Sequence, residues 1–504
     1  MAQKCTVSID VGTGSTRAAV LSREARILKS ASREYEQIVS EHGWSEQRAD
    51  DWWQAACDSL LECMEWTRGE DIALEALAVC GQMHGTVLVD GNGALTRETV
   101  PLWNDKRTLR HVIDFEAREH VAAWLPRTAN PPTPAWPAFK LQWLRDNDRE
   151  AYQRAETLLM PKDYINLRLT GERSMDWTEA ACSFLMDPQT GGWSQSVIAD
   201  LGLDPSILAP IRKPDALLGH VTQSAAEQTG LPDGLPVALG GADFAMALLG
   251  SGACRPGVAS EVAGTSAIIT LVADQPVLHP EISNIGTAEG NWGAFVLLEA
   301  GGDAARWARR VFHDAPPSYG EILDRAATAP VGSGALFFLP YLVGERLGQH
   351  RNSRAQFFGL SAAHRTEHLH RAVLEGVGFA VNRHLEVMEE ATGAKAPILV
   401  ASGGGAKADL WLKIKASIYN RPIKIPEEAE CGLVGNAIIA QAVVGEAPSV
   451  EAAAGRLVRY ARTVEPEPDW VAHYAKMQPI FDRLYDAAQS FYPDLEALGS
   501  EEVR

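Results

Sequence analysis

Apolar runs with the length of β-strands alternate along this chain with amphipathic stretches of helical period, which is the pattern of an α/β fold. Residues 6–10 and 17–21 are strand-like runs that flank a glycine-rich turn, so they predict a β-hairpin. Asp50 and Asp51 precede two tryptophans and predict the first turn of a helix, where negative side chains are favourable. Residues 76–80 predict a further strand.

A long helix is predicted in the second half of the chain. Apolar side chains recur at helical spacing from Leu369 to Met388, and the stretch includes Gly376 and Gly378. An interior glycine costs about 1 kcal/mol of helix propensity. Its presence therefore predicts that another backbone packs closely against the helix.

The chain is long enough for two domains. It has 504 residues and is 46% hydrophobic, which is more than one hydrophobic core usually serves. A glycine cluster at 250–252, directly after the apolar run 244–249, indicates a boundary. We therefore expect an N-terminal domain of residues 1–250 and a C-terminal domain of residues 251–504, with a cleft between them.

A faint internal repeat links the two halves. Residues 8–16 (SIDVGTGST) are similar to residues 260–266 (SEVAGTS), because each is an apolar strand that turns through Gly-Thr into a hydroxyl-rich segment. Glycines, turn N–H groups and hydroxyls suit an oxyanion, so the two turns could form facing phosphate loops, although each alone could be a plain hairpin. Asp10 in the first copy corresponds to Val262 in the second, so a bound cation would belong to the Asp10 side.

Composition and net charge limit the classes of partner that the protein can bind. Lys and Arg total 46 against 65 Asp and Glu, a formal net charge of −19, which opposes binding to a nucleic-acid backbone. A nucleotide is not excluded, because backbone N–H groups and a divalent cation act locally. Seven scattered cysteines indicate reduced thiols, and there is no long apolar segment or signal sequence. We expect a cytoplasmic protein that binds neither nucleic acid nor membranes.

Several spaced motifs resemble those of the FGGY carbohydrate kinases, which belong to the actin-like (ribonuclease H-like) ATPases. Besides the two Gly-Thr turns they are residues 355–360 (AQFFGL), 368–375 (HLHRAVLE), 137–144 (PAFKLQWL), 401–406 (ASGGGA) and 169–172 (LTGE). The resemblance runs nearly end to end and departs from one signature at Ala135, its opening position. It implies a two-domain actin-like α/β fold that binds a sugar and ATP in the cleft.

The resemblance also implies roles for particular residues. Asp243 corresponds to the base that takes the proton of the sugar hydroxyl, and N-capping of the following helix is its alternative role. Asp10 corresponds to a carboxylate that holds Mg²⁺, through water, and a plain turn carboxylate is the alternative. The positions that correspond to nucleotide contacts are Gly12, Thr13, Gly14, Ser15, Thr16, Arg17, Gly264, Thr265, Gly302, Gly404, Gly405 and Asp409.

The implied sugar site is similar to that of the xylulokinases within this family. Gln82, Met83 and His84 stand in a segment with which these enzymes line the sugar pocket, and Trp103 lies in a second similar segment. A histidine beside an apolar strand is otherwise more often a structural group with satisfied hydrogen bonds, which is the alternative for His84.

Two further residues bear on the sugar. Asp105 offers two acceptor oxygens to sugar hydroxyls, and a salt bridge with Lys106 or Arg107 is its alternative role. Phe244 departs from the pattern, because many xylulokinases have a polar residue there that could bind the sugar. An apolar ring at this position favours a shorter or differently configured acceptor.

These assignments imply transfer of the γ-phosphate of Mg-ATP to the terminal hydroxyl of a ketopentose, with D-xylulose first. Another ketopentose or a tetritol is the alternative acceptor. A sugar-sensing ATPase without transfer activity is an alternative of a different class, and intact Asp10 and Asp243 argue against it. A homodimer is a further expectation.

Overall fold

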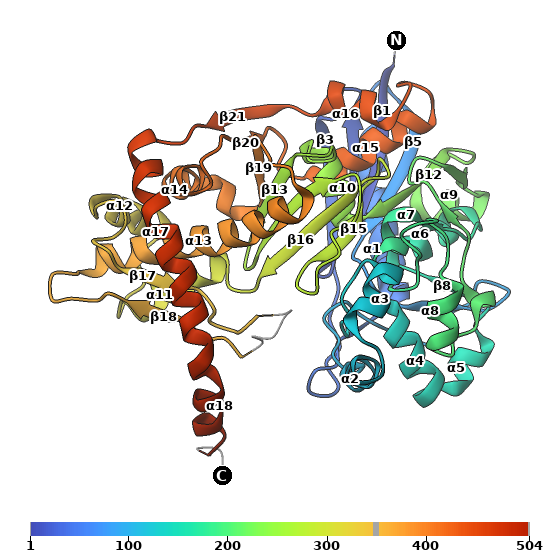
Figure 1. Ribbon diagram of the computed structural model, residues 1–504. Coiled ribbons are helices and arrows are strands. Elements are labelled where there is room, and N and C mark those ends of the chain that lie inside the picture. Colours follow the sequence, from blue (N-terminus) through green and yellow to red (C-terminus); the bar gives the residue numbers. More distant parts are fainter. Residues whose placement is uncertain (1, 346–351, 502–504) are drawn as a thin grey trace.

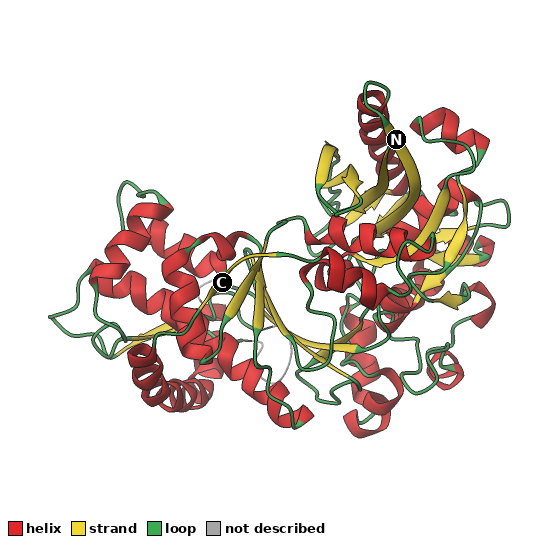
Figure 2. Cartoon of the chain, turned by 90° about the horizontal axis from the view of Figure 1, so that it is seen from above, coloured by secondary structure: helices red, strands yellow, loops and turns green. Residues whose placement is uncertain are grey.

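The computed structural model describes residues 2–345 and 352–501, and most of its strands form two large sheets (Figure 1). The first has the order β11 (Leu217–His220), β12 (Pro236–Ala242), β5 (Ile72–Gly81), β1 (Gln3–Val11), β2 (Ser15–Ser22) and β3 (Ile27–Glu34). The second has the order β15 (Ser283–Gly286), β16 (Trp292–Leu298), β14 (Ala267–Ala273), β13 (Ala259–Ala263), β19 (Leu399–Ser402), β20 (Ile423–Pro426) and β21 (Tyr460–Val464). Figure 2 shows a lobe of helices around each sheet, so the predicted α/β class is confirmed.

The same three-stranded unit stands at the centre of both sheets. β1 pairs antiparallel with β2 and parallel with β5, and β13 pairs antiparallel with β14 and parallel with β19. Asp10 lies opposite Arg17 in the first hairpin, and Val262 lies opposite Ile268 in the second. The internal repeat predicted from the two Gly-Thr turns is therefore confirmed as a repeat of strand topology.

Helices and small two-stranded sheets surround these units. The helices of the first half are α1 (Ala49–Thr67), α2 (Leu109–Arg118), α3 (Val121–Thr128), α4 (Pro137–Asn147), α5 (Arg149–Arg154), α6 (Pro161–Thr170), α7 (Trp177–Ala181), α8 (Gln195–Asp200), α9 (Gln223–Thr229) and α10 (Asp243–Ser251). Those of the second half are α11 (Gly302–Val311), α12 (Tyr319–Thr328), α13 (Thr366–Thr392), α14 (Asp409–Tyr419), α15 (Cys431–Val443), α16 (Val450–Leu457), α17 (Pro468–Ala488) and α18 (Tyr492–Glu501). The short pairs are β4 (Glu46–Arg48) with β7 (Thr99–Pro101), β6 (Val87–Val89) with β8 (Thr157–Leu159), β9 (Met175–Asp176) with β10 (Ile211–Arg212), and β17 (Phe337–Leu339) with β18 (Gln356–Phe358).

Helices α10 and α15 cross at very short range. A Cβ atom placed on Gly250 would lie 1.9 Å from the carbonyl oxygen of Cys431, and one on Gly435 would lie 2.1 Å from that of Met246. Helices α15 and α16 belong to the hydrophobic core of the first sheet although they come late in the chain. The expected boundary at residue 250 falls within α10, so the division into residues 1–250 and 251–504 stays a prediction.

The long helix of the second half is α13, and its glycines make the predicted close contacts. A Cβ atom on Gly376 would lie 2.1 Å from the carbonyl oxygen of Phe338. At Gly378 the nearest atom is instead a side-chain carbon, Cδ1 of Ile418, at 2.7 Å. Close backbone packing is therefore confirmed at Gly376.

Two further expectations concern membrane-spanning helices and the cysteine thiols. Among the described residues, none of the helices combines the length and the apolar composition needed to cross a bilayer. All seven cysteines are buried free thiols, as the scattered spacing predicts.

Candidate active site

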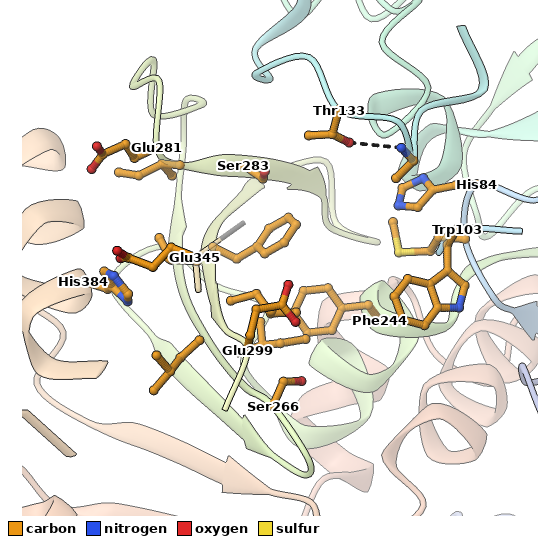
Figure 3. Close-up of a pocket in the computed structure, with 18 of the residues that line it drawn as sticks. His84, Trp103, Thr133, Phe244, Ser266, Glu281, Ser283, Glu299, Glu345 and His384 are labelled. Carbon is orange, nitrogen blue, oxygen red and sulfur yellow. Dashed lines mark hydrogen bonds between the residues drawn. The ribbon is translucent and has the colours of Figure 1, made fainter. Parts of the chain in front are cut away.

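A cavity of about 720 Å³ lies at the carboxyl ends of β1, β5 and β12 and reaches across to the second sheet (Figure 3). Carboxyl ends of parallel strands are the usual place for a ligand in an open α/β sheet, because side chains of the following loops converge there. His84, Trp103 and Phe244 line one side, and Glu345 and His384 line the other. Both halves of the chain therefore contribute to one cavity.

Asp243 lies at the cavity as the first residue of α10. The N-cap position belongs to Ala242 and no side chain caps the helix, so the N-capping alternative for Asp243 is wrong. Its Oδ1 accepts a hydrogen bond of 2.6 Å from the backbone N–H of Phe244. Burial, and then the negative charge of Asp10, raise the pKa of Asp243 to about 7. This carboxyl can therefore take up and release a proton near neutral pH.

A buried polar network holds the strand end in front of Asp243. The hydroxyl of Thr178 accepts from the backbone N–H of Ala242 at 2.9 Å and donates to Asp176, which is paired with Lys162 at 2.9 Å. Sequence reasoning missed this support. The signal was the N-cap pattern at the start of α7, where Asp176 accepts from the backbone N–H groups of Thr178 and Glu179.

Asp10, near the carboxyl end of β1, lines the same cavity. Its Oδ1 is buried and has no hydrogen-bond partner among the described residues. Burial raises the pKa of Asp10 to about 6, while a hydrogen bond from the Cys80 thiol and the charge of Arg17 act in the opposite direction. The structure describes no group of three or more His, Cys, Asp or Glu side chains that could hold a metal ion by themselves. A single unsatisfied carboxylate oxygen fits a hydrated cation that is shared with the phosphates of a nucleotide.

Gln82, Met83, His84 and Trp103, the four residues expected at the sugar, all line the cavity. Gln82 donates to Gln47 at 2.9 Å. Trp103 Nε1 donates to the hydroxyl of Thr13 at 3.0 Å, and His84 Nδ1 bonds the carbonyl oxygen of Cys182 at 3.1 Å. These hydrogen bonds fix the side chains before any ligand binds.

Asp105 does not line the cavity, and its expected contact with a sugar stays a prediction. Its carboxylate forms a two-point salt bridge with Arg107, at 2.8 to 3.0 Å, and accepts from the backbone N–H of Ser45 at 2.7 Å. The salt bridge named as the alternative is therefore what the structure contains, and it is buried rather than on a solvated loop. Asp105 thus ties the loop that follows Trp103 to Ser45.

The first Gly-Thr turn presents part of its length to the cavity. Thr13 lines the cavity, and the turn is closed by a hydrogen bond of 3.0 Å from the N–H of Gly12 to the carbonyl oxygen of Ser15. Thr16 is buried and its hydroxyl donates to Tyr35, so its side chain does not line the cavity, and its contact with a nucleotide stays a prediction. Arg17 is ion-paired with Glu430, and Gly14 has open space around it.

The glycines expected at the nucleotide pack together beside the cavity without lining it. The N–H of Gly302 donates to the carbonyl oxygen of Gly264 at 3.0 Å, and that of Asp303 donates to Thr265 at 2.9 Å. A Cβ atom on Gly302 would lie 2.2 Å from that Gly264 oxygen, so only glycine fits. Ser266, which follows these turns, does line the cavity.

The last expected nucleotide residues follow β19. A Cβ atom on Gly405 would lie 2.6 Å from Cβ of Ala263, and one on Gly404 would lie 4.0 Å from its carbonyl oxygen, so this turn adjoins the end of β13. Asp409 is the first residue of α14, is largely exposed and pairs with Arg462. Three separate turns, those of Gly264, Gly302 and Gly405, thus lie together at the end of β13 in the second sheet.

Comparisons with known proteins agree with this architecture. The model of the N-terminal domain of the FGGY family of carbohydrate kinases matches residues 5–250, and that of the C-terminal domain matches residues 259–443. Xylulose kinase of Bacillus subtilis is 28% identical over 490 residues, which cover 96% of this chain and 97% of the relative. Gluconate kinase from Lactobacillus acidophilus has a TM-score of 0.92 at 26% identity and covers 98% of this chain and 100% of its own. Xylulose kinase from Rhodospirillum rubrum has a TM-score of 0.90 at 28% identity and covers 96% and 99%.

These matches extend over nearly the whole chain and include both sheets. The predicted two-domain actin-like fold is therefore confirmed. Because both domain models match in the expected order, this chain belongs to the FGGY family of carbohydrate kinases.

Proposed function

We propose that this carbohydrate kinase transfers the γ-phosphate of ATP to the terminal hydroxyl of a neutral ketopentose, D-xylulose first, and that the product is D-xylulose 5-phosphate. The observation that carries the proposal is the buried Asp243 carboxyl, with its pKa near 7, at a cavity that also holds His84 and Trp103. As the hydroxyl oxygen bonds to the γ-phosphorus, the bond from phosphorus to the leaving ADP oxygen breaks and Asp243 takes the proton.

The nucleotide is expected at the clustered turns of the second sheet. Gly264, Thr265, Gly302 and the turn with Gly404 and Gly405 would receive ATP, with backbone N–H groups as donors. Thr13 and the first turn would approach the phosphates from the opposite side. Asp10 would hold Mg²⁺, through water, and the ion would supply positive charge to the phosphate oxygens.

The charge of the cavity supports a neutral acceptor. Among lining residues in the described parts of the chain, Arg383 alone carries a permanent positive charge. It belongs to α13, whose His384 lies across the cavity from His84 in Figure 3. An aldonate such as gluconate would add a carboxylate to a cavity whose lining already includes five acidic side chains, namely Asp10, Asp243, Glu281, Glu299 and Glu345. Such a charge is costly in a partly buried site. The similarity to xylulose kinases therefore weighs more than that to gluconate kinase.

A coupled ADP assay over ketopentoses, tetritols and gluconate tests this proposal. We expect kcat/KM for D-xylulose to exceed that for gluconate about 10²-fold, because one unpaired carboxylate costs a few kcal/mol. Gluconate as the best acceptor would overturn the assignment.

The alternative acceptors are distinguished in the same assay. Phe244 packs edge-on against Phe295 with ring centroids 5.6 Å apart, so the wall beside Asp243 is apolar. If another ketopentose or a tetritol exceeds D-xylulose, this wall selects the shorter or differently configured acceptor.

Domain closure is the next expected outcome. Asp243 lines the cavity whereas Gly264 and Gly302 do not, so both sides can reach one phosphate only if the two sheets approach. Sugar together with a non-hydrolysable ATP analogue should lower the radius of gyration in solution X-ray scattering. Sugar alone and analogue alone serve as controls, and an unchanged profile with both ligands saturating would contradict closure.

A further inference from the structure

The backbone of His84 has an unusual conformation at the sugar side of the cavity. Its φ angle is 67°, in the left-handed region that residues with a side chain rarely adopt. Such a conformation persists only where its surroundings hold it in place. Gly85, the next residue, packs so closely on α6 that a Cβ atom would lie 2.5 Å from Cγ of Pro161.

Three contacts hold His84 in this conformation. Lys140 Nζ donates to the carbonyl oxygen of His84 at 2.7 Å, and Nδ1 of His84 bonds the carbonyl oxygen of Cys182 at 3.1 Å. The imidazole ring meets Trp136 edge-on, with ring centroids 4.9 Å apart. Because a carbonyl oxygen can only accept, Nδ1 must carry the hydrogen. In the neutral ring Nε2 is then an acceptor, which suits the hydroxyl of a sugar.

Lys140 is an unusual residue to find behind a sugar pocket. Its side chain, from α4, is 1% exposed and does not line the cavity. Burial lowers the pKa of Lys140 to about 7. The negative charge of Asp105 opposes this shift, and the positive charge of Arg107 adds to it. Burying an amine costs free energy unless the amine is hydrogen-bonded. In this structure the amine of Lys140 donates to the carbonyl oxygen of His84.

We propose that Lys140 is a positioning residue for sugar recognition. It holds the left-handed turn at His84, so that the imidazole faces the sugar that accepts the phosphate. The inference rests on the proposed function for the placement of the sugar beside His84. Lys140 acts through the His84 carbonyl group and touches neither the sugar nor ATP. The negative charge of Asp105 acts on the Lys140 amine and opposes the effect of burial, which gives Asp105 an indirect part in the pocket.

Lys140→Met removes the donor and keeps most of the volume of the side chain. We expect the KM for the sugar to rise about 10-fold while the KM for ATP stays within about 2-fold, because only the turn at His84 loses a support. His84→Asn provides a background in which the left-handed conformation is less strained, since asparagine tolerates it. In that background Lys140→Met should change the sugar KM less than about 2-fold, which is the sign of coupling between the two residues.

The assay uses whichever carbohydrate the wild-type enzyme phosphorylates best. A wrong sugar assignment is then seen in the wild type, and a wrong role for Lys140 is seen only in the variants. Equal effects in both backgrounds, or parallel losses for sugar and ATP, would overturn the proposal in favour of a purely structural lysine. If Lys140→Met does not fold, Lys140→Gln takes its place in the same cycle, because its neutral amide still donates but reaches less far.

Discussion

Replacing Asp243 by asparagine should lower kcat by about 10² or more, because the substitution removes the proton acceptor from the cavity. The amide oxygen can still accept the hydrogen bond of 2.6 Å that the N–H of Phe244 donates. The geometry at the start of α10 is therefore kept, and the loss is chemical. The measurement is sugar-dependent ADP release at saturating substrates.

The pH dependence separates the role of Asp243 as a base from its effect on stability. The pKa of Asp243 rises from 3.8 to about 7 on folding, so the wild-type rate should rise with pH through about 7 as the carboxylate forms. A raised carboxyl pKa means that folding favours the protonated form, so stability is lost as pH rises from about 4 to about 7. Asp243→Asn should therefore unfold at a higher temperature than the wild type at pH 8, with an advantage of at most about 4 kcal/mol that vanishes near pH 4.

Two results would contradict the role of Asp243 as the base. Early melting of Asp243→Asn with unchanged turnover would make the carboxylate a structural group. A wild-type rate that does not change between pH 6 and pH 8 would place the critical proton transfer on another residue.

Asp10→Asn should yield an enzyme that needs about 10-fold more magnesium for half-maximal rate and that turns over slowly even at saturation. Oδ1 of Asp10 is buried, faces the cavity and lacks a partner among the described residues. Asparagine keeps an oxygen ligand but removes the negative charge that attracts the ion. The measurement is a magnesium titration of sugar-dependent ADP production.

Asp243→Asn is the matched control for this titration. It also neutralises a buried carboxyl at the same cavity, yet it should lower the rate at every magnesium concentration without moving the midpoint. Val262→Asp should not rescue Asp10→Asn, because the second turn is expected to face phosphate oxygens, where another negative charge repels. A wild-type magnesium profile in Asp10→Asn would remove Asp10 from the metal site and leave the role of Asp243 to its own test.

The sequence by itself determined the local geometry and the repeat. Strand period and glycine-rich turns predict the hairpins of β1 with β2 and of β13 with β14, which the strand pairing confirms. The helical spacing of apolar residues predicts α13, and an interior glycine predicts the close approach at Gly376. These features depend on backbone sterics and on the burial of one face of each element. Both depend on residues that are close together in the sequence.

Only the tertiary structure decided what surrounds each functional side chain. Asp105 has the right type for a sugar contact, but a buried salt bridge with Arg107 occupies its oxygens. Thr16 stands in the phosphate-loop motif, yet the strand pairing turns its hydroxyl to Tyr35. The pKa of Asp243 and the hydrogen bond from Lys140 to His84 arise from elements far apart in the chain. Burial and charge partners of this kind depend on long-range packing, which the order of neighbouring residues does not contain.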